Sequence, residues 1–182
     1  MPHEAKKIPP FGSPIALPKP QKPFQPLPPK PKGGELIATL ESVAPEAARR
    51  VRASGRLVFH TVGDTGGVNG TEVQERIADA MQAQLNEMRD DSRPGFFYLL
   101  GDVVYPVGAP EDYNDLFYKP FKHYDAPIVA IPGNHDGYGL PQVAGSSLNG
   151  WRMNFLGTLP VEHRFPYRDP MELPYVYWEL VQ

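Results

Sequence analysis

The chain has 182 residues, of which 23 are proline and none is cysteine, and its formal net charge is −3. The lack of cysteine excludes disulfides, thiolate metal sites and a cysteine nucleophile. The small negative charge gives no general attraction to nucleic acid or to an anionic membrane, so we expect neither as a partner. This length suits one domain with additional segments.

Residues 1–34 contain eleven of the prolines and are predicted to form a disordered tail. Proline fixes φ and lacks an N–H donor, and too few apolar residues are present to offset the entropy of ordering. Pro20, Pro23, Pro26 and Pro29 recur every third residue, which lines one face of a polyproline II helix. Such a face suits an aromatic-lined groove of a partner domain. A stiff spacer that carries lysines is the alternative, and the composition favours it.

Neither a leader peptide nor a membrane segment is predicted. Proline interrupts every apolar run near the N-terminus, so the core of a signal peptide is missing. No stretch approaches the roughly 20 apolar residues of a membrane span. We therefore expect a cytoplasmic protein.

After the tail, residues 35–54 are predicted to be helical, with a break at Ala44-Pro45. Residues 55–63, GRLVFHTVG, are the first predicted strand, because β-branched and aromatic residues lead into a glycine. His60 alternates with valines on this strand and is expected to be a hydrogen-bonded histidine of the core or edge rather than a ligand.

A helix is predicted next. Thr71 and Gln74 have the spacing of a capping box at its start. An apolar stripe at helical spacing predicts the face that packs on the core. The stripe consists of Val73, Ile77, Met81, Leu85 and Met88.

Two more strands are predicted at 94–102, PGFFYLLGD, and at 126–134, APIVAIPGN, with a short helix between them that ends by Pro120. The apolar run at 94–102 is nearly continuous, which is typical of a strand buried on both faces. Residues 137–174 are expected to be loop, and 175–182 a further strand. Strands that alternate with helices predict an α/β fold with parallel pairing.

The three central strands end in similar motifs, GDTG at 63–66, GDVVY at 101–105 and GNHD at 133–136. In parallel sheets functional groups collect beyond the carboxyl ends of the strands, so these motifs are expected to converge. Converging carboxylates repel unless a cation lies between them. Carboxylate, amide, phenolate and imidazole groups suit hard or borderline metal ions. The alternatives are that the aspartates are helix N-caps or turn residues and that Tyr105 is a packed aromatic.

The three motifs, in this order and each after a strand, resemble those of the calcineurin-like metallophosphoesterase superfamily, over roughly residues 55–140. The forms Gly-Asp-x-Gly and Gly-Asp-x-x-Tyr look like its purple acid phosphatase branch. Gly66 stands where the commoner form of the first motif has histidine, and Tyr105 is placed to supply the missing ligand. The resemblance implies that residues 35–182 are the N-terminal portion of an αββα sandwich.

The resemblance also implies a dinuclear metal site and the hydrolysis of a phosphate ester by a metal-activated hydroxide. Asp64 would bind the first ion, Asp102 would bridge both, and Tyr105 would bind the first as phenolate, which favours ferric iron there. Asn134 would bind the second ion, which would be iron, manganese or zinc. His135 would contact the phosphate and protonate the leaving oxygen.

Other polar residues have less specific roles. Asp136 is expected to support the ligands or to shape a turn rather than to bind metal. Arg152 is a candidate for pairing with phosphate, with an ordinary surface arginine as the alternative. Tyr138, Trp151 and Tyr167 are candidates for lining the substrate pocket. His123 is expected on a surface turn.

The family pattern continues with Val-x-x-His and Gly-His-x-His, and neither occurs in this sequence. His163 lies in a proline-rich stretch and lacks the spacing of these motifs. The second ion would keep only Asp102 and Asn134, although imidazole supplies much of the affinity for transition metals. We therefore expect these residues to be the front part of a longer enzyme, incomplete at the C-terminus.

Two other functions remain open. The first is a degenerate domain without catalysis, whose proline-rich tail is an interaction segment. The second is a nucleotide-binding domain in which GDTGGVNG, residues 63–70, cradles a phosphate. This stretch lacks both the Gly-x-Gly-x-x-Gly spacing and the P-loop lysine, which disfavours nucleotide binding.

Overall fold

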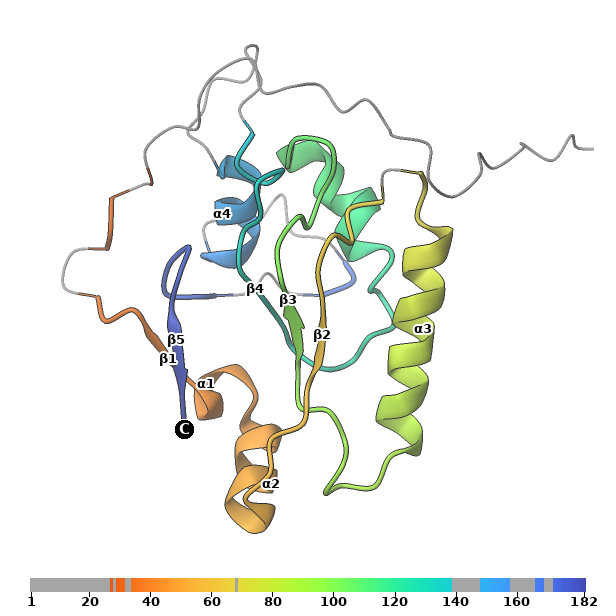
Figure 1. Cartoon of the computed structure of the whole chain (residues 1–182), viewed down its shortest axis with the longest axis vertical. Coiled ribbons are helices and arrows are strands. Elements are labelled where there is room, and N and C mark those ends of the chain that lie inside the picture. The colour runs from red at the N-terminus through yellow and green to blue at the C-terminus, as the bar shows by residue number, and fades with distance from the viewer. Residues whose placement is uncertain are drawn as a thin grey trace, which may run out of the picture.

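The computed structural model describes residues 27, 29–31, 34–67, 69–138, 148–157, 166–168 and 172–182. Across these ranges the chain is mixed α/β with parallel sheets, as predicted (Figure 1). Most of the predicted tail, including Pro20, Pro23 and Pro26, lies outside the described residues, as does His163. The elements are β1 (Ile37–Thr39), α1 (Leu40–Val43), α2 (Pro45–Ser54), β2 (His60–Val62), α3 (Glu72–Glu87), β3 (Phe97–Leu99), the 3-10 helix η1 (Pro110–Asp112), the π-helix η2 (Asn114–Tyr118), β4 (Ile128–Ala130), α4 (Asn149–Phe155) and β5 (Glu179–Val181).

The central sheet has the order β2-β3-β4, and both pairs of neighbours are parallel. His60 of β2 is in register with Phe97 of β3, which is in register with Ile128 of β4. This arrangement confirms the three predicted strands and their parallel pairing, although each strand is shorter than the apolar run that predicted it. All three strands run toward the upper end of the view in Figure 1, so their carboxyl ends share one edge.

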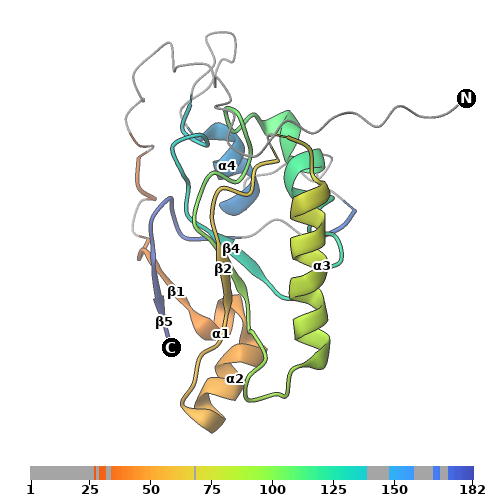
Figure 2. The same ribbon diagram turned by 45° about the vertical axis from the view of Figure 1, so that its right-hand side comes forward.

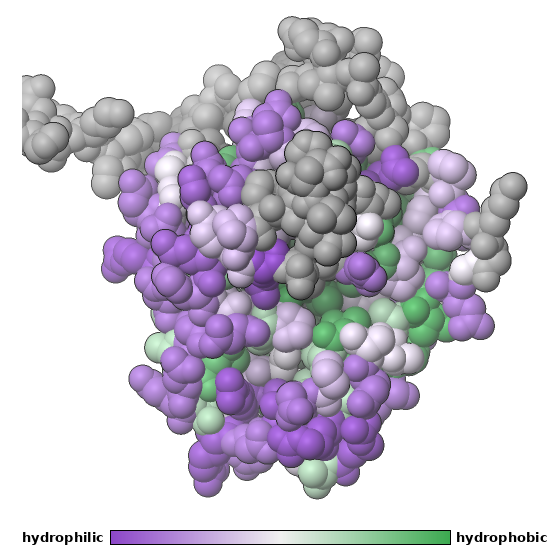
Figure 3. Space-filling view, turned by 180° about the vertical axis from the view of Figure 1, so that it is seen from behind, coloured by the Kyte–Doolittle hydropathy of each residue, from purple (hydrophilic) through white to green (hydrophobic). Residues whose placement is uncertain are grey.

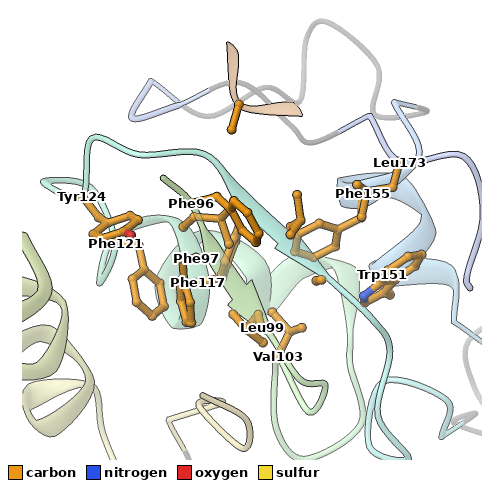
Figure 4. Packing of buried hydrophobic residues seen from close by; sticks show 14 of the residues in the cluster. Phe96, Phe97, Leu99, Val103, Phe117, Phe121, Tyr124, Trp151, Phe155 and Leu173 are labelled. Atoms are coloured by element: carbon orange, nitrogen blue, oxygen red, sulfur yellow. The ribbon is translucent and has the colours of Figure 1, made fainter. Parts of the chain in front are cut away.

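One face of this sheet is covered by an aromatic core. Phe97 of β3 packs against Phe121 with 5.4 Å between ring centroids, and Phe117 of η2 lies 5.4 Å from Phe155 of α4 (Figure 4). Helix α3 adds Ala78, Met81 and Leu85 to the same buried cluster. Aromatic side chains bury large areas, so this face supplies much of the hydrophobic stabilisation.

The other face of β3 contacts a second sheet, in which β1 and β5 pair in parallel. Trp178, just before β5, lies edge-on to Tyr98 at 6.3 Å and donates its indole N–H to the carbonyl of Ala130 at 3.3 Å. Figures 1 and 2 both place the β1–β5 pair on the side of the central sheet away from α3. Tyr98 therefore alternates with its buried neighbours and faces this second layer rather than the aromatic core.

The predicted helix at 35–54 is wrong at its start and correct afterwards. Ile37–Thr39 is a strand because it pairs with Glu179–Val181, about 140 residues along the chain. The break at Ala44 is confirmed, since α1 ends at Val43 and α2 begins at Pro45. Strand pairing between such distant segments leaves no local pattern that could be read from residues 35–39.

The predicted capping box at Thr71 and Gln74 is wrong. The Thr71 hydroxyl donates to the Glu75 carboxylate at 2.8 Å instead of accepting from the helix backbone. Gln74 is buried and donates its amide to the carbonyl of Leu116 in η2 at 2.8 Å. A contact with another element has therefore replaced the local capping interaction.

The predicted apolar stripe of α3 is correct only in part. Met81 and Leu85 are buried, whereas Met88 lies beyond the helix and is exposed. Val73 is 66% exposed and Ile77 is 45% exposed. The helix is turned so that Gln74 and Ala78 face the core, where Gln74 bonds to η2.

Residues 149–155, predicted to be loop, form helix α4. Trp151 and Phe155 of this helix are fully buried. A Cβ atom on Gly150 would overlap the carbonyl of Gly108, so glycine allows α4 to approach the loop before η1 closely. Gly150, which favoured a loop in the sequence, is thus required for the close packing of α4.

The surface seen from behind is largely hydrophilic, with hydrophobic residues gathered in a band across its middle (Figure 3). Among the described residues no helix combines the length and apolar character needed to cross a membrane.

The contact between the two sheets can be tested at Trp178. Replacing Trp178 by alanine removes the edge contact with Tyr98 and the bond to Ala130, so we expect the free energy of unfolding to fall by about 2 kcal/mol. Urea denaturation followed by circular dichroism measures the change. The neighbouring Tyr177→Ala is the matched control, since Tyr177 is exposed, and equal losses in both variants would contradict the proposed packing.

Candidate metal centre

The three motif loops begin at the same edge of the central sheet. Val62, Leu99 and Ala130, the last residues of their strands, are aligned in register. The N–H of Asp64 donates to the carbonyl of Gly101 at 3.1 Å, which joins the first loop to the second. The predicted convergence of the motifs is therefore confirmed at the level of the backbone.

Asp64 and Asp102 both have left-handed backbone conformations, with φ of 57° and 49°. Such conformations are uncommon outside glycine, and aspartate is one of the few residues enriched in them. The next described helices have Thr71 and Ala109 as N-caps, so the alternative that these aspartates cap helices is wrong. Both aspartates instead lie in sharp turns just beyond strands of the central sheet.

The phenol oxygen of Tyr105 lies between the two carboxylates. It is 2.9 Å from Asp64 Oδ1 and 3.0 Å from Asp102 Oδ2. A phenol has one proton and can donate it to only one of these oxygens at a time. Such spacings suit neighbouring ligands around an octahedral ion with metal–oxygen distances of about 2.1 Å. The three oxygens therefore form a donor set that fits a hard cation.

The charge state of Tyr105 depends on whether a cation is present. Burial, followed by the bonds to Asp64 and Asp102, raises the pKa of the Tyr105 phenol. The phenolate would place a third negative charge beside two carboxylates, so it is disfavoured unless a cation is present. A bound cation reverses this effect and favours the phenolate.

Gly66 makes room for Tyr105. A Cβ atom at position 66 would overlap the Tyr105 ring and would lie 2.6 Å from the Tyr105 backbone nitrogen. The same nitrogen donates to the Gly66 carbonyl at 3.3 Å, which keeps the two loops in contact. A side chain at 66 and the observed position of Tyr105 therefore exclude each other.

The second and third loops meet at Asp102. This buried aspartate accepts the backbone N–H of His135 through Oδ1 at 2.8 Å. A Cβ atom on Gly133 would overlap the Asp102 carboxylate, so glycine is needed for this approach. Asn134 is exposed, and its amide nitrogen donates to the hydroxyl of Tyr138 at 2.9 Å. The structure thus brings the loop of Asn134 and His135 against Asp102.

His135 is buried, and its ring makes three contacts. Its Nδ1 lies 2.7 Å from the carbonyl oxygen of Pro106, and since a carbonyl can only accept, Nδ1 carries a proton. The imidazole ring lies 4.4 Å from the ring of Tyr105 and 4.6 Å from that of Tyr138. The remaining nitrogen, Nε2, is therefore the one available for a substrate.

Asp136 links the second motif loop to the third. Its carboxylate accepts the N–H of Val103 at 3.2 Å and that of Gly133 at 2.8 Å. Burial raises the pKa of Asp136 to about 6, and the N–H donors partly oppose this rise. These contacts are those of a residue that supports the loops.

Several predicted residues lie elsewhere. Arg152 is partly buried on α4 and is not part of the three loops. His60 is hydrogen-bonded, as predicted, with Nδ1 2.9 Å from the Tyr124 hydroxyl and Nε2 2.8 Å from Gln84 Oε1. His123 lies on an exposed turn, also as predicted. Pro106, which orients His135, was not predicted, and no residue pattern indicated it.

The structure agrees with the sequence in that the candidate metal centre has few histidine ligands. In the part of the chain that the structure describes, no three side chains among histidine, aspartate and glutamate are grouped to hold a metal ion. Tyrosine and asparagine complete the set, so the candidate centre depends on Tyr105 and Asn134 as well as on the aspartates.

The steric role of Gly66 can be tested with Gly66→Ala. Because the new methyl group would overlap Tyr105, we expect the free energy of unfolding to fall by about 1–3 kcal/mol. Gly63→Ala is the matched control, since its nearest neighbour is Leu100 Cβ at 3.3 Å. Adding Tyr105→Ala to Gly66→Ala should recover only part of the loss, since the backbone nitrogen remains close. A Gly66→Ala protein as stable as the wild type in urea would refute this role.

The support from Asp136 can be tested with Asp136→Asn. The substitution replaces one carboxylate oxygen by an N–H₂ donor, which would face the N–H of Val103 or of Gly133 instead of accepting from it. We expect a loss of about 1–3 kcal/mol in urea denaturation. Asp79→Asn, on the exposed face of α3, should change stability by less than about 0.5 kcal/mol. Similar values for both variants would show that Asp136 is not a support.

Comparison with known proteins agrees with this arrangement. A family model described as calcineurin-like phosphoesterase matches residues 57–177, a range that includes all three motif loops. No curated protein and no solved structure matched the chain. The matched range covers well over half of the sequence, and the chain therefore belongs to the calcineurin-like phosphoesterase family.

Proposed function

We propose that this domain hydrolyses phosphate esters with the help of bound metal ions at the edge of the central sheet. Family membership suggests metal-dependent phosphoester hydrolysis. The observation that carries the proposal for this chain is the Tyr105 oxygen between the carboxylates of Asp64 and Asp102. A parallel sheet that needed no cation would gain nothing from placing three acidic groups together.

In the proposed dinuclear site, Asp64, Asp102 and Tyr105 hold the first ion, while Asp102 and Asn134 hold the second. Three oxygen donors fit the first ion well. The proposal gives the second ion only two donors, Asp102 and Asn134. The dinuclear proposal therefore requires further ligands for the second ion, which a longer enzyme would supply from beyond these 182 residues.

The purple acid phosphatase-like branch is the more specific form of the proposal. It is supported by the exclusion between a side chain at Gly66 and the ring of Tyr105. A phenolate ligand favours ferric iron at the first position, and iron, manganese or zinc suits the second. When bound, the ions supply a hydroxide at neutral pH and offset charge on the phosphoryl group.

The protein itself would orient the substrate and transfer a proton through His135. With Nδ1 held by Pro106, Nε2 is the nitrogen left for the substrate, and it can donate to a phosphate oxygen when it carries a proton. The Pro106 carbonyl accepts from Nδ1 whether or not Nε2 is protonated, so the ring keeps the same orientation. His135 can then donate that proton from Nε2 to the leaving oxygen.

The alternative is a degenerate domain without catalysis, whose proline-rich tail is an interaction segment. It is favoured by the observation that, among the described residues, no three histidine, aspartate or glutamate side chains are grouped to hold a metal ion. Metal binding and hydrolysis separate the two proposals, because the degenerate domain would show neither.

The catalytic proposal can be tested with Asp102→Asn in the active, full-length protein. Loss of the bridging carboxylate should lower hydrolysis of p-nitrophenyl phosphate by roughly 100- to 1,000-fold or more. Asparagine can still accept the His135 N–H, so the fold should persist. Asp115→Asn is the matched control, since Asp115 pairs with Lys119 on the surface. Activity retained in Asp102→Asn would refute the proposal, and metal analysis of both variants would show whether the ions are lost.

A further inference from the structure

We infer that Tyr138 is a positioning residue that holds the side chain of Asn134 in place beside the metal centre. This inference rests on the proposed function, in which Asn134 is a metal ligand. It concerns how the ligand is oriented before any ion binds.

The backbone places Tyr138 over its two partners. The N–H of Gly137 donates to the carbonyl of Asn134 at 3.1 Å, and that of Tyr138 donates to the carbonyl of His135 at 3.3 Å. Residues 134–137 therefore form consecutive turns, in which side chains three and four positions apart become neighbours. Tyr138 is three residues from His135 and four from Asn134, so one side chain contacts both.

The hydroxyl of Tyr138 holds the amide end of the Asn134 side chain. It accepts from Nδ2 at 2.9 Å, and Oδ1 takes no part in that bond. Only the oxygen of a carboxamide can bind a cation, because the amide nitrogen has no lone pair to offer. The bond at Nδ2 can therefore persist when Oδ1 binds a cation, so it restrains the ligand side chain before and after metal binding.

The ring of Tyr138 makes a second, separate contact. It lies edge-on to His135 with 4.6 Å between centroids, and His135 also contacts the ring of Tyr105. Tyr138→Phe removes the hydroxyl and keeps this ring, whereas Tyr138→Leu removes both. The two variants therefore separate the orientation of Asn134 from the packing of His135.

The experiment measures Mn²⁺ binding by the full chain through calorimetry, in the wild type, Tyr138→Phe, Asn134→Ala and the double variant. Loss of one neutral hydrogen bond should weaken Mn²⁺ binding in Tyr138→Phe by roughly three- to tenfold. In the Asn134→Ala background the same change should alter the affinity less than twofold, since the group that Tyr138 orients is gone. Tyr177→Phe, which removes an exposed hydroxyl from another part of the surface, is the matched control.

Two results would overturn the inference. One is wild-type affinity in Tyr138→Phe, and the other is an equal loss in both backgrounds, which would mean that Tyr138 acts by packing alone. A wild type that binds no Mn²⁺ would count against the proposed function instead. In that case NMR of the ¹⁵N-labelled asparagine side chains still decides, because the Asn134 amide signal must shift in Tyr138→Phe if the hydroxyl orients it. An unchanged Asn134 signal would overturn the inference regardless of metal.

Discussion

The centre of this domain depends on one electrostatic constraint, the contact of a phenol oxygen with two carboxylates. Tyr105 can satisfy only one of Asp64 and Asp102 with its single proton. The burial of Asp102 strengthens its repulsion of other acidic groups, and it strengthens equally its attraction for a cation. The raised pKa of Tyr105 and the proposed affinity for metal are thus two results of the same arrangement.

The fold meets this constraint through the sheet and through the backbone. Parallel strands in register deliver three loops to one edge. The left-handed conformations of Asp64 and Asp102 turn the chain sharply, and Gly66 and Gly133 remove the atoms that would block approach. Asp136 of the third loop then fixes the second by accepting the buried N–H of Val103. The motif glycines are therefore as necessary to the centre as its oxygen donors.

The sequence was sufficient to predict the strands and the motif residues because both leave local patterns, an apolar run followed by glycine and a polar residue. It was insufficient for Ile37–Thr39, because that strand exists only through its pairing with Glu179–Val181. It was also insufficient for the rotation of α3, in which Gln74 faces the core and donates to the Leu116 carbonyl of η2. Contacts between distant elements set these features, and hydrophobic periodicity does not record them. The contact of Tyr138 with Asn134 is an intermediate case. Its i to i+4 spacing can be read from the sequence, but the contact can be inferred only once residues 134–137 are known to form turns.

The two proposed metal positions differ in how firmly the protein prepares them. The first is built from groups that touch one another across two loops, beneath a glycine that admits no side chain. The second depends on the exposed amide of Asn134, whose orientation rests on a single neutral hydrogen bond. A ligand that is already oriented loses less conformational freedom when an ion binds, so a prepared position binds more tightly with the same number of donors. The two positions therefore differ in the preorganisation of the protein as well as in the number of ligands. The hydrogen bond from Asn134 to Tyr138 supplies part of the preorganisation of the second position.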